Sequence, residues 1–345
     1  MDNNRGVTVS MVYKQIAESF LFRGEEALPL RYQPKTGSLR AVRDRARDDL
    51  ADTVRYEEHR DYVVDYDAGT IRRTAESRIP DGRHHPMYGV RKFNHVEYPD
   101  FSNHSYTVYL DYVTESEDAE GVQVTADEIQ RSGLLNRFVR KLAAGDEALY
   151  VVYGDSISTG GEASEEGLAY FGRFAAVLER LYPNGRIRIV NKSIGGEATD
   201  GGAARVNSDV VPLQPDLVTI GYGMNDQNFY EKEGVYGTTL EQFDRNLRQM
   251  IDAIGESGDT DLVLVTPCEP NPHWQHTSGK TALYADVIRQ LGKEYGIGVA
   301  DAHALWTAEL AAGKTPESLL LNNINHPNDY GHWIYSKAFP RMFKR

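Results

Sequence analysis

Short apolar runs alternate with longer amphipathic segments through the second half of the chain. The apolar runs have the length of buried strands and lie at 150–154, 187–190, 217–220, 262–265 and 297–300. Between them, apolar side chains recur every three or four residues, as on one face of a helix, at 165–181, 240–254 and 283–291. Strands separated by helices predict a parallel sheet with helices on both of its faces. We therefore expect an α/β domain here.

The first part of the chain shows a different pattern, that of short strands. Polar and apolar residues alternate within 60–74, where a turn separates two strands, and again within 105–113. The first helical pattern is a short one at 132–142. Short strands joined by loops favour a β-sandwich-like fold. The expected organisation is a β-rich accessory domain over 1–145 and an α/β domain over 146–345.

Charge and composition argue against several classes of function. The chain of 345 residues has a formal net charge of −13, and no basic stripe of the kind that binds nucleic acid is visible. The single cysteine, Cys268, excludes an internal disulfide, and no cysteine cluster indicates zinc. No segment is long and apolar enough to span a bilayer, and residues 1–13 lack the apolar stretch of a signal peptide. We expect a cytoplasmic protein that binds neither nucleic acid nor membrane, and secretion with a removed signal peptide stays open.

Four polar loops carry residues with catalytic chemistry, and three of these loops directly follow predicted strands. The loops are 154–156 (Gly-Asp-Ser), 191–196 (Asn-Lys-Ser-Ile-Gly-Gly), 221–226 (Gly-Tyr-Gly-Met-Asn-Asp) and 322–332, which contains His-Pro-Asn-Asp-Tyr-Gly-His. Ligands of parallel α/β sheets bind at the carboxyl ends of the strands. Such loops can therefore meet around one substrate.

Each loop alone has an ordinary structural explanation, as a helix cap, a turn or a structural histidine. Together they supply all the parts that acyl transfer requires. Ser156 is a candidate nucleophile, and His326 is a candidate base that would activate it. The backbone N–H of Gly196 and the side chain of Asn225 are candidate donors to an oxyanion.

The four blocks resemble those of the SGNH, or GDSL-type, serine hydrolase family. The family is named for Ser, Gly, Asn and His, and the matching residues here are Ser156, Gly196, Asn225 and His326. The resemblance implies a three-layer α/β/α, flavodoxin-like fold. It also implies an oxyanion hole made of the Ser156 and Gly196 backbone N–H groups and the Asn225 side chain, with His326 as the base. No metal and no cofactor is expected.

One position departs from the family pattern. Most members have an Asp three residues before the histidine, where this chain has Asn323. An asparagine cannot stabilise an imidazolium by charge, and the equivalent exchange in a serine protease costs about four orders of magnitude in rate. Ser156 and His326 then act as a dyad, steadied by a carbonyl group or by Asn323. Alternatively, Asp301 or Asp329 supplies the missing carboxylate. Loss of catalysis is the third interpretation.

A proline-rich loop at 266–276 lies on the same predicted sheet edge as Ser156. Asn271, His273 and Trp274 in this loop either contact a sugar substrate or belong to a rigid connection with the tryptophan packed beneath it. The histidines and the glutamate of the loop have a spacing that matches no helical metal-binding motif. The loop is therefore expected to hold substrate or to stiffen the site, and not to bind a metal.

The expected function is that of a serine esterase that hydrolyses small acyl esters, with acetyl groups on a carbohydrate as the expected substrate. The substrate rests on resemblance, because some carbohydrate esterases combine a β-sandwich with this catalytic fold. The alternatives are a lipid or thioester acylhydrolase on the same scaffold and a catalytically inactive carbohydrate-binding protein. The expected partner is a small-molecule or oligosaccharide ester, and the sequence leaves open whether the chain forms a homo-oligomer.

Overall fold

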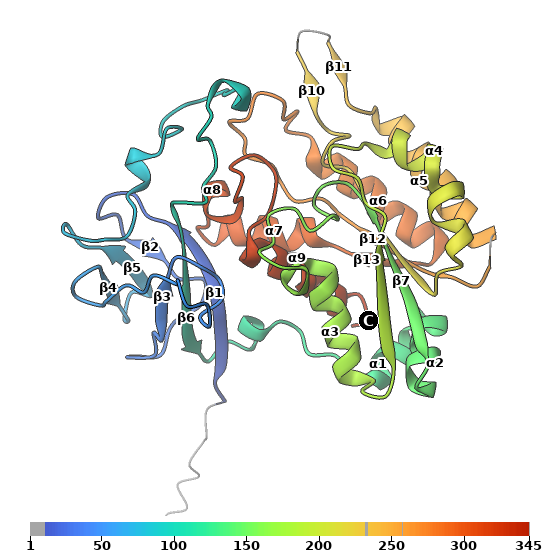
Figure 1. Ribbon diagram of the computed structural model, residues 1–345, viewed down its shortest axis with the longest axis horizontal. Helices are drawn as coiled ribbons and strands as arrows, with labels where there is room; N and C mark the ends of the chain where they lie inside the picture. The colour runs from blue at the N-terminus through green and yellow to red at the C-terminus, as the bar shows by residue number, and fades with distance from the viewer. Residues whose placement is uncertain (1–10, 232–233, 257, 345) are drawn as a thin grey trace, which may run out of the picture. The chain divides into compact units, whose positions relative to one another are not determined.

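The computed structural model describes residues 11–231, 234–256 and 258–344 (Figure 1). These residues form two compact units. The first contains the described part of Met1–Arg83 together with Tyr106–Val122. The second contains His84–Ser105 and the described part of Gln123–Arg345.

The second unit is built around a parallel sheet of five strands in the order β13-β12-β9-β7-β8. The strands are β7 (Glu147–Gly154), β8 (Arg186–Asn191), β9 (Leu217–Gly221), β12 (Asp261–Val265) and β13 (Gly298–Ala300). Side chains along β7 alternate between two cores: Tyr150 and Val152 lie in one, and Val151 and Tyr153 lie in the other. Each strand corresponds to one of the apolar runs in the sequence, which confirms the predicted sheet.

Helices cover both faces of this sheet (Figure 1). The core that holds Tyr150 is closed by α1 (Ala126–Ser132), α2 (Asn136–Ala144), α3 (Tyr170–Leu181), α7 (Ala302–Ala311), α8 (Pro316–Leu319) and α9 (Asp329–Arg341). The other core is closed by α4 (Thr199–Asp209), α5 (Leu240–Glu256) and α6 (Thr281–Tyr295). A short two-stranded sheet, β10 (Phe229–Tyr230) with β11 (Val235–Tyr236), follows β9 in the chain. The predicted three-layer α/β/α fold is confirmed.

Two segments that the sequence pattern assigns to residues 1–145 pack in the second unit. Segment His84–Ser105 joins it through Phe93, which is buried against Trp274. Helix α2 joins it because Phe138 and Leu142 lie in the core beneath the parallel sheet. The loop segment has no hydrophobic period, so the sequence does not indicate which core it joins.

The first unit consists of two antiparallel sheets, as expected for a β-sandwich-like fold. One has the order β1-β6-β3, with β1 (Tyr13–Leu21), β6 (Thr107–Thr114) and β3 (Ala41–Arg43). The other has the order β2-β5-β4, with β2 (Leu28–Pro29), β5 (Thr70–Arg73) and β4 (Tyr62–Asp65). Buried side chains from both sheets share one core, for example Leu110 of β6 and Ile71 of β5. The hairpin predicted within 60–74 is the β4–β5 pair.

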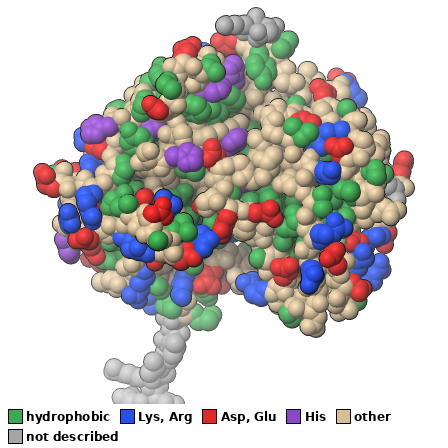
Figure 2. Space-filling model, in the orientation of Figure 1, with side chains coloured by type: hydrophobic (Ala, Val, Ile, Leu, Met, Phe, Trp, Pro, Cys, Tyr) green, Lys and Arg blue, Asp and Glu red, His purple; other side chains and the backbone are tan. Residues whose placement is uncertain are grey.

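The surface in view carries both signs of charge. Figure 2 shows Lys and Arg side chains interspersed with Asp and Glu on the displayed face. In the ranges that the structure describes, no helix is long and apolar enough to cross a membrane. The mixed charge on this face agrees with the absence of a basic stripe in the sequence.

Candidate active site

The turn after β7 places Ser156 at the carboxyl end of the parallel sheet. A Cβ on Gly154 would lie 2.2 Å from the carbonyl oxygen of Gly221, so only glycine fits at the end of this strand. The next residue, Asp155, is buried and its carboxylate accepts a hydrogen bond from the Ile157 N–H at 3.0 Å. Burial raises the pKa of Asp155 to about 7. Asp155 thus shapes the turn, and Ser156 remains 8% exposed.

Ser156 and His326 are hydrogen-bonded although 170 residues separate them in the chain. His326 Nε2 lies 2.7 Å from Ser156 Oγ, within the range for proton transfer. The loop before α9 fixes the histidine, because Asn322 Oδ1 accepts hydrogen bonds from the backbone N–H groups of Ile324, Asn325 and His326, each at 2.9 Å. The two residues that the sequence proposes as nucleophile and base therefore meet.

The imidazole of His326 is largely buried and favours its neutral form. Burial lowers its pKa below the usual 6.5, and the negative charge of Glu162 raises the pKa in opposition. A neutral imidazole at neutral pH can accept the Ser156 proton. At neutral pH, His326 is therefore mainly in the neutral form that a general base needs.

The loop after β8 brings Gly195 and Gly196 beside Ser156. A Cβ on Gly195 would lie 3.8 Å from Ser156 Cβ, and Gly196 has a φ of +78°, which glycine adopts without strain. The Ile194 N–H donates to the carbonyl of Gly154 at 3.0 Å, which ties this loop to the end of β7. The geometry places the loop where backbone N–H groups can face the reacting carbonyl.

Asn225 is tied to the same loop. Its Nδ2 donates to the carbonyl oxygen of Glu197 at 3.0 Å. Glu197 is in turn held by a salt bridge to Arg205 at 2.5 Å and by the Tyr222 hydroxyl at 2.6 Å. An amide nitrogen carries two N–H groups, so this bond uses one donor of Asn225. The network fixes the Asn225 side chain and leaves the second N–H of Nδ2 available to a ligand.

The side chain of Asn323 is not hydrogen-bonded to the imidazole of His326. Asn323 has a φ of +58°, and its Oδ1 and its backbone oxygen accept hydrogen bonds from Asn271 Nδ2 at 2.9 Å and 3.0 Å. Across the described ranges, no group is hydrogen-bonded to Nδ1 of His326. Asn323 therefore anchors its loop to the segment around Asn271 rather than orienting the histidine directly.

The two aspartates considered as replacements are also engaged elsewhere. Asp301 caps α7 through the Ala304 N–H and forms a salt bridge to Arg289 at 2.8 Å. Asp329 accepts hydrogen bonds from the backbone N–H and the hydroxyl of Ser164, at 2.9 Å and 2.8 Å. Neither carboxylate is hydrogen-bonded to His326, because each has strong donors of its own.

Of the two alternatives for the proline-rich loop 266–276, the structure shows the rigid connection with the tryptophan packed beneath it. Trp274 is 7% exposed, packs against Phe93, and donates from Nε1 to His95 Nδ1 at 3.2 Å. Asn271 is 2% exposed, and the His273 carbonyl accepts the Phe93 N–H at 2.8 Å. The ring of Trp274 is thus covered and offers no open face for a sugar.

The sequence pattern did not predict two residues that lie next to the site, Glu162 and His104. Glu162 follows the Gly160–Gly161 pair that comes shortly after Ser156, and its carboxylate lies 2.7 Å from His104 Nε2. A charged residue directly after a glycine pair, close to a candidate nucleophile, is a sequence signal that could have indicated Glu162. His104 lies in the irregular segment 84–105, where nothing in the sequence marks one histidine above the others.

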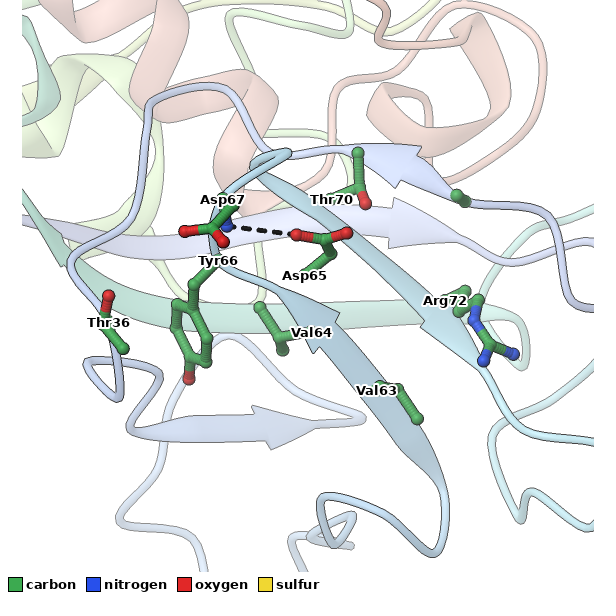
Figure 3. A pocket seen from close by; sticks show the side chains of 9 residues that line it. Thr36, Val63, Val64, Asp65, Tyr66, Asp67, Thr70 and Arg72 are labelled. Atoms are coloured by element: carbon green, nitrogen blue, oxygen red, sulfur yellow. Dashed lines mark hydrogen bonds between the residues drawn. The ribbon is translucent and has the colours of Figure 1, made fainter.

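A hollow of about 550 Å³ lies in the β-rich unit beside β4 and β5 (Figure 3). Tyr66, Asp67 and Arg72 are among the residues that line it. The carboxylate of Asp65 is directed back at the hairpin turn, where it accepts the Asp67 N–H at 3.1 Å. No serine and no histidine lines the hollow, so it lacks the groups that acyl transfer requires.

Comparison with known proteins agrees with the geometry. Residues 152–334, more than half of the chain, match the GDSL-like Lipase/Acylhydrolase family. The chain is 29% identical to an acetylxylan esterase of Geobacillus stearothermophilus over 216 residues, which cover 58% of this chain and 95% of that protein. It is 31% identical to Esterase TesA of Pseudomonas aeruginosa over 162 residues, which cover 46% of this chain and 74% of that protein.

Among solved structures, that of Axe2, an acetylxylan esterase from Geobacillus stearothermophilus, is similar with a TM-score of 0.48 at 27% identity. The similarity covers 57% of this chain and 94% of that one. The fold and the family match define a carboxylic ester hydrolase. The chain belongs to the GDSL-like lipase/acylhydrolase family.

Proposed function

We propose that this esterase removes acetyl groups from a carbohydrate through an acyl-enzyme on Ser156. The observation that carries the proposal is the 2.7 Å contact between Ser156 Oγ and His326 Nε2 beside the loops of Gly196 and Asn225. The similarity to an acetylxylan esterase along almost all of that protein's length supports the acetyl and carbohydrate parts of the substrate.

The reaction proceeds in two halves. Ser156 Oγ attacks the ester carbonyl while His326 Nε2 takes the hydroxyl proton, and the carbonyl oxygen becomes an oxyanion. The backbone N–H groups of Ser156 and Gly196 and the Asn225 side chain donate to that oxygen. The bond between the carbonyl carbon and the sugar oxygen then breaks, His326 gives the proton to that departing oxygen, and the acetyl group stays on Ser156 Oγ as the acyl-enzyme. A water molecule, deprotonated by His326, then attacks the acetyl carbon; the bond from that carbon to Ser156 Oγ breaks, acetate leaves, and His326 returns the proton to Ser156 Oγ.

The test is hydrolysis of p-nitrophenyl acetate and of acetylated xylo-oligosaccharides by the wild type and by Ser156→Ala. We expect turnover of both substrates that disappears in Ser156→Ala. Ser193→Ala serves as the matched control, since Ser193 lies in the neighbouring loop and its hydroxyl bonds the Val152 carbonyl at 3.4 Å. Wild-type protein that binds the oligosaccharide without hydrolysing it would overturn the enzymatic role.

A lipid or thioester acylhydrolase is the second candidate, and the family match to lipases and acylhydrolases favours testing it. A series of p-nitrophenyl esters from acetate to palmitate separates the two. We expect kcat/KM to fall as the acyl chain lengthens. A maximum at long chains would contradict the acetyl specificity while leaving the esterase mechanism in place.

A further inference from the structure

The chain after Ser156 returns to the far side of the His326 ring. The Gly161 N–H donates to the Ser156 carbonyl at 3.0 Å, and the Gly161 carbonyl accepts from His332 Nε2 at 3.0 Å. A Cβ on Gly161 would lie 3.3 Å from His326 Nδ1. Segment 160–162 is thus fixed next to the ring nitrogen that faces away from the nucleophile.

Glu162 occupies this segment in a conformation that few residues adopt. Its φ is +66°, in the left-handed region where a side chain is strained. Its carboxylate is held by His104, whose Nε2 lies 2.7 Å from Oε2, and 23% of its side chain is exposed. The strained backbone and the bond to His104 together indicate that the Glu162 carboxylate is held at a defined position beside the active site.

The charges around Glu162 favour its ionised form. The hydrogen bond with His104 lowers the pKa of Glu162, and the charges of His104, His326 and His332 act in the same direction. The same hydrogen bond raises the pKa of His104. Other charged groups nearby are Arg173 and Asp329, which lie next to His332 and Ser164. At neutral pH Glu162 is therefore a carboxylate.

We propose that Glu162, held in place by His104, is a positioning residue that supplies the negative charge missing at Asn323. The proposal rests on the proposed function of Ser156 and His326. When His326 accepts the Ser156 proton, the resulting imidazolium is stabilised through space by the Glu162 carboxylate. The proton stays on His326 and leaves with the alcohol, so Glu162 does not change its own protonation state.

This assignment explains why the other carboxylates can be engaged elsewhere. Asp301 and Asp329 each bind donors of their own, and Asn323 binds Asn271. Glu162 is the charged group whose interaction with His326 opposes the effect of burial. A charge from a different loop does the work that the family motif assigns to a residue near the histidine.

The first measurement is the pKa of the His326 imidazole, followed by NMR in protein with labelled histidine. A nearby opposite charge raises a histidine pKa by about one unit or more. In Glu162→Gln we expect the pKa of His326 to fall by about one unit. In the control Glu166→Gln, which changes an exposed carboxylate four residues later, we expect that pKa to stay unchanged. An unchanged pKa in Glu162→Gln overturns the proposal, whether or not the protein hydrolyses esters.

The second measurement is the pH profile of kcat and kcat/KM with p-nitrophenyl acetate. One pKa unit corresponds to a factor of ten in stabilisation of the imidazolium. We expect Glu162→Gln to lower kcat by about tenfold or more with little change in KM, and to move the acid limb of kcat/KM to lower pH. His104→Gln should give a smaller loss. Wild-type kcat and an unmoved acid limb in Glu162→Gln contradict the role, whereas a wild type without Ser156-dependent turnover contradicts the proposed function alone.

Discussion

The side chain of Asn271 binds Asn323 twice, through contacts of Nδ2 with Oδ1 at 2.9 Å and with the backbone oxygen at 3.0 Å. The backbone N–H of Asn271 also donates to the Ile324 carbonyl at 2.7 Å. The loop after β12 and the loop after α8, which carries His326, are therefore joined directly. Asn323 thus binds a neighbouring loop and is not hydrogen-bonded to the imidazole.

Asn271→Ala should destabilise the protein more than it slows the reaction. The exchange leaves two buried acceptors of Asn323 without their donor, which costs about 1–3 kcal/mol of unfolding free energy. Urea unfolding of the variant measures this loss. His273→Ala, in the same loop, is the control and should change stability by a smaller amount. Unchanged stability with a large loss of kcat would instead place Asn271 in contact with substrate.

Gly161→Ala should damage catalysis by displacing Ser156 or His326. The new Cβ would lie 2.7 Å from the Ser156 carbonyl oxygen and 3.3 Å from His326 Nδ1, so one of these groups must shift. Small displacements of catalytic groups cost about 100-fold in rate, and we expect a loss of that order in kcat. Gly167→Ala is the matched control, because its Cβ meets no atom within 4 Å. Equal activities of the two variants would show that the segment around Gly161 can shift to make room for the Cβ without displacing Ser156 or His326.

The sequence was sufficient for the sheet, for the covering helices α3, α5 and α6, and for the meeting of Ser156 with His326. The reason is physical: a buried parallel strand requires a continuous apolar run, and its carboxyl end determines where the following loop lies. The apolar runs that end at Val190 and Ile220 therefore located the loops of Gly196 and Asn225. At these two loops, the local sequence pattern was enough to predict where the loop lies in the fold.

The sequence was insufficient where position depends on contacts between distant loops. Segment 84–105 has no hydrophobic period, so its packing against Trp274 could not be inferred. The partner of Asn323 could not be inferred either, because Asn271 lies 52 residues away on another loop. The role of Glu162 depends on a similar contact between distant segments, because its carboxylate is held by His104, 58 positions earlier in the chain.

Asn225→Ala tests the side-chain donor to the oxyanion. Loss of one such donor costs about 100- to 1,000-fold in kcat, because the charge that develops on oxygen loses a preorganised N–H group. We expect that loss with little change in KM. Asn184→Ala, an exposed asparagine, is the control. A loss confined to KM would assign Asn225 to ground-state binding.

The pH dependence of kcat/KM should report the titration of His326. Only the neutral imidazole can accept the Ser156 proton, so activity must fall as pH decreases through the pKa of His326. Burial lowers this pKa, so the neutral form persists to more acidic solutions and the midpoint of the acid limb should lie below 6.5. Inactivation of Ser156 by a fluorophosphonate, measured over the same pH range, should follow the same midpoint, because it needs the same base. A midpoint above 6.5 in both assays would mean that the attraction of Glu162 for the imidazolium outweighs burial.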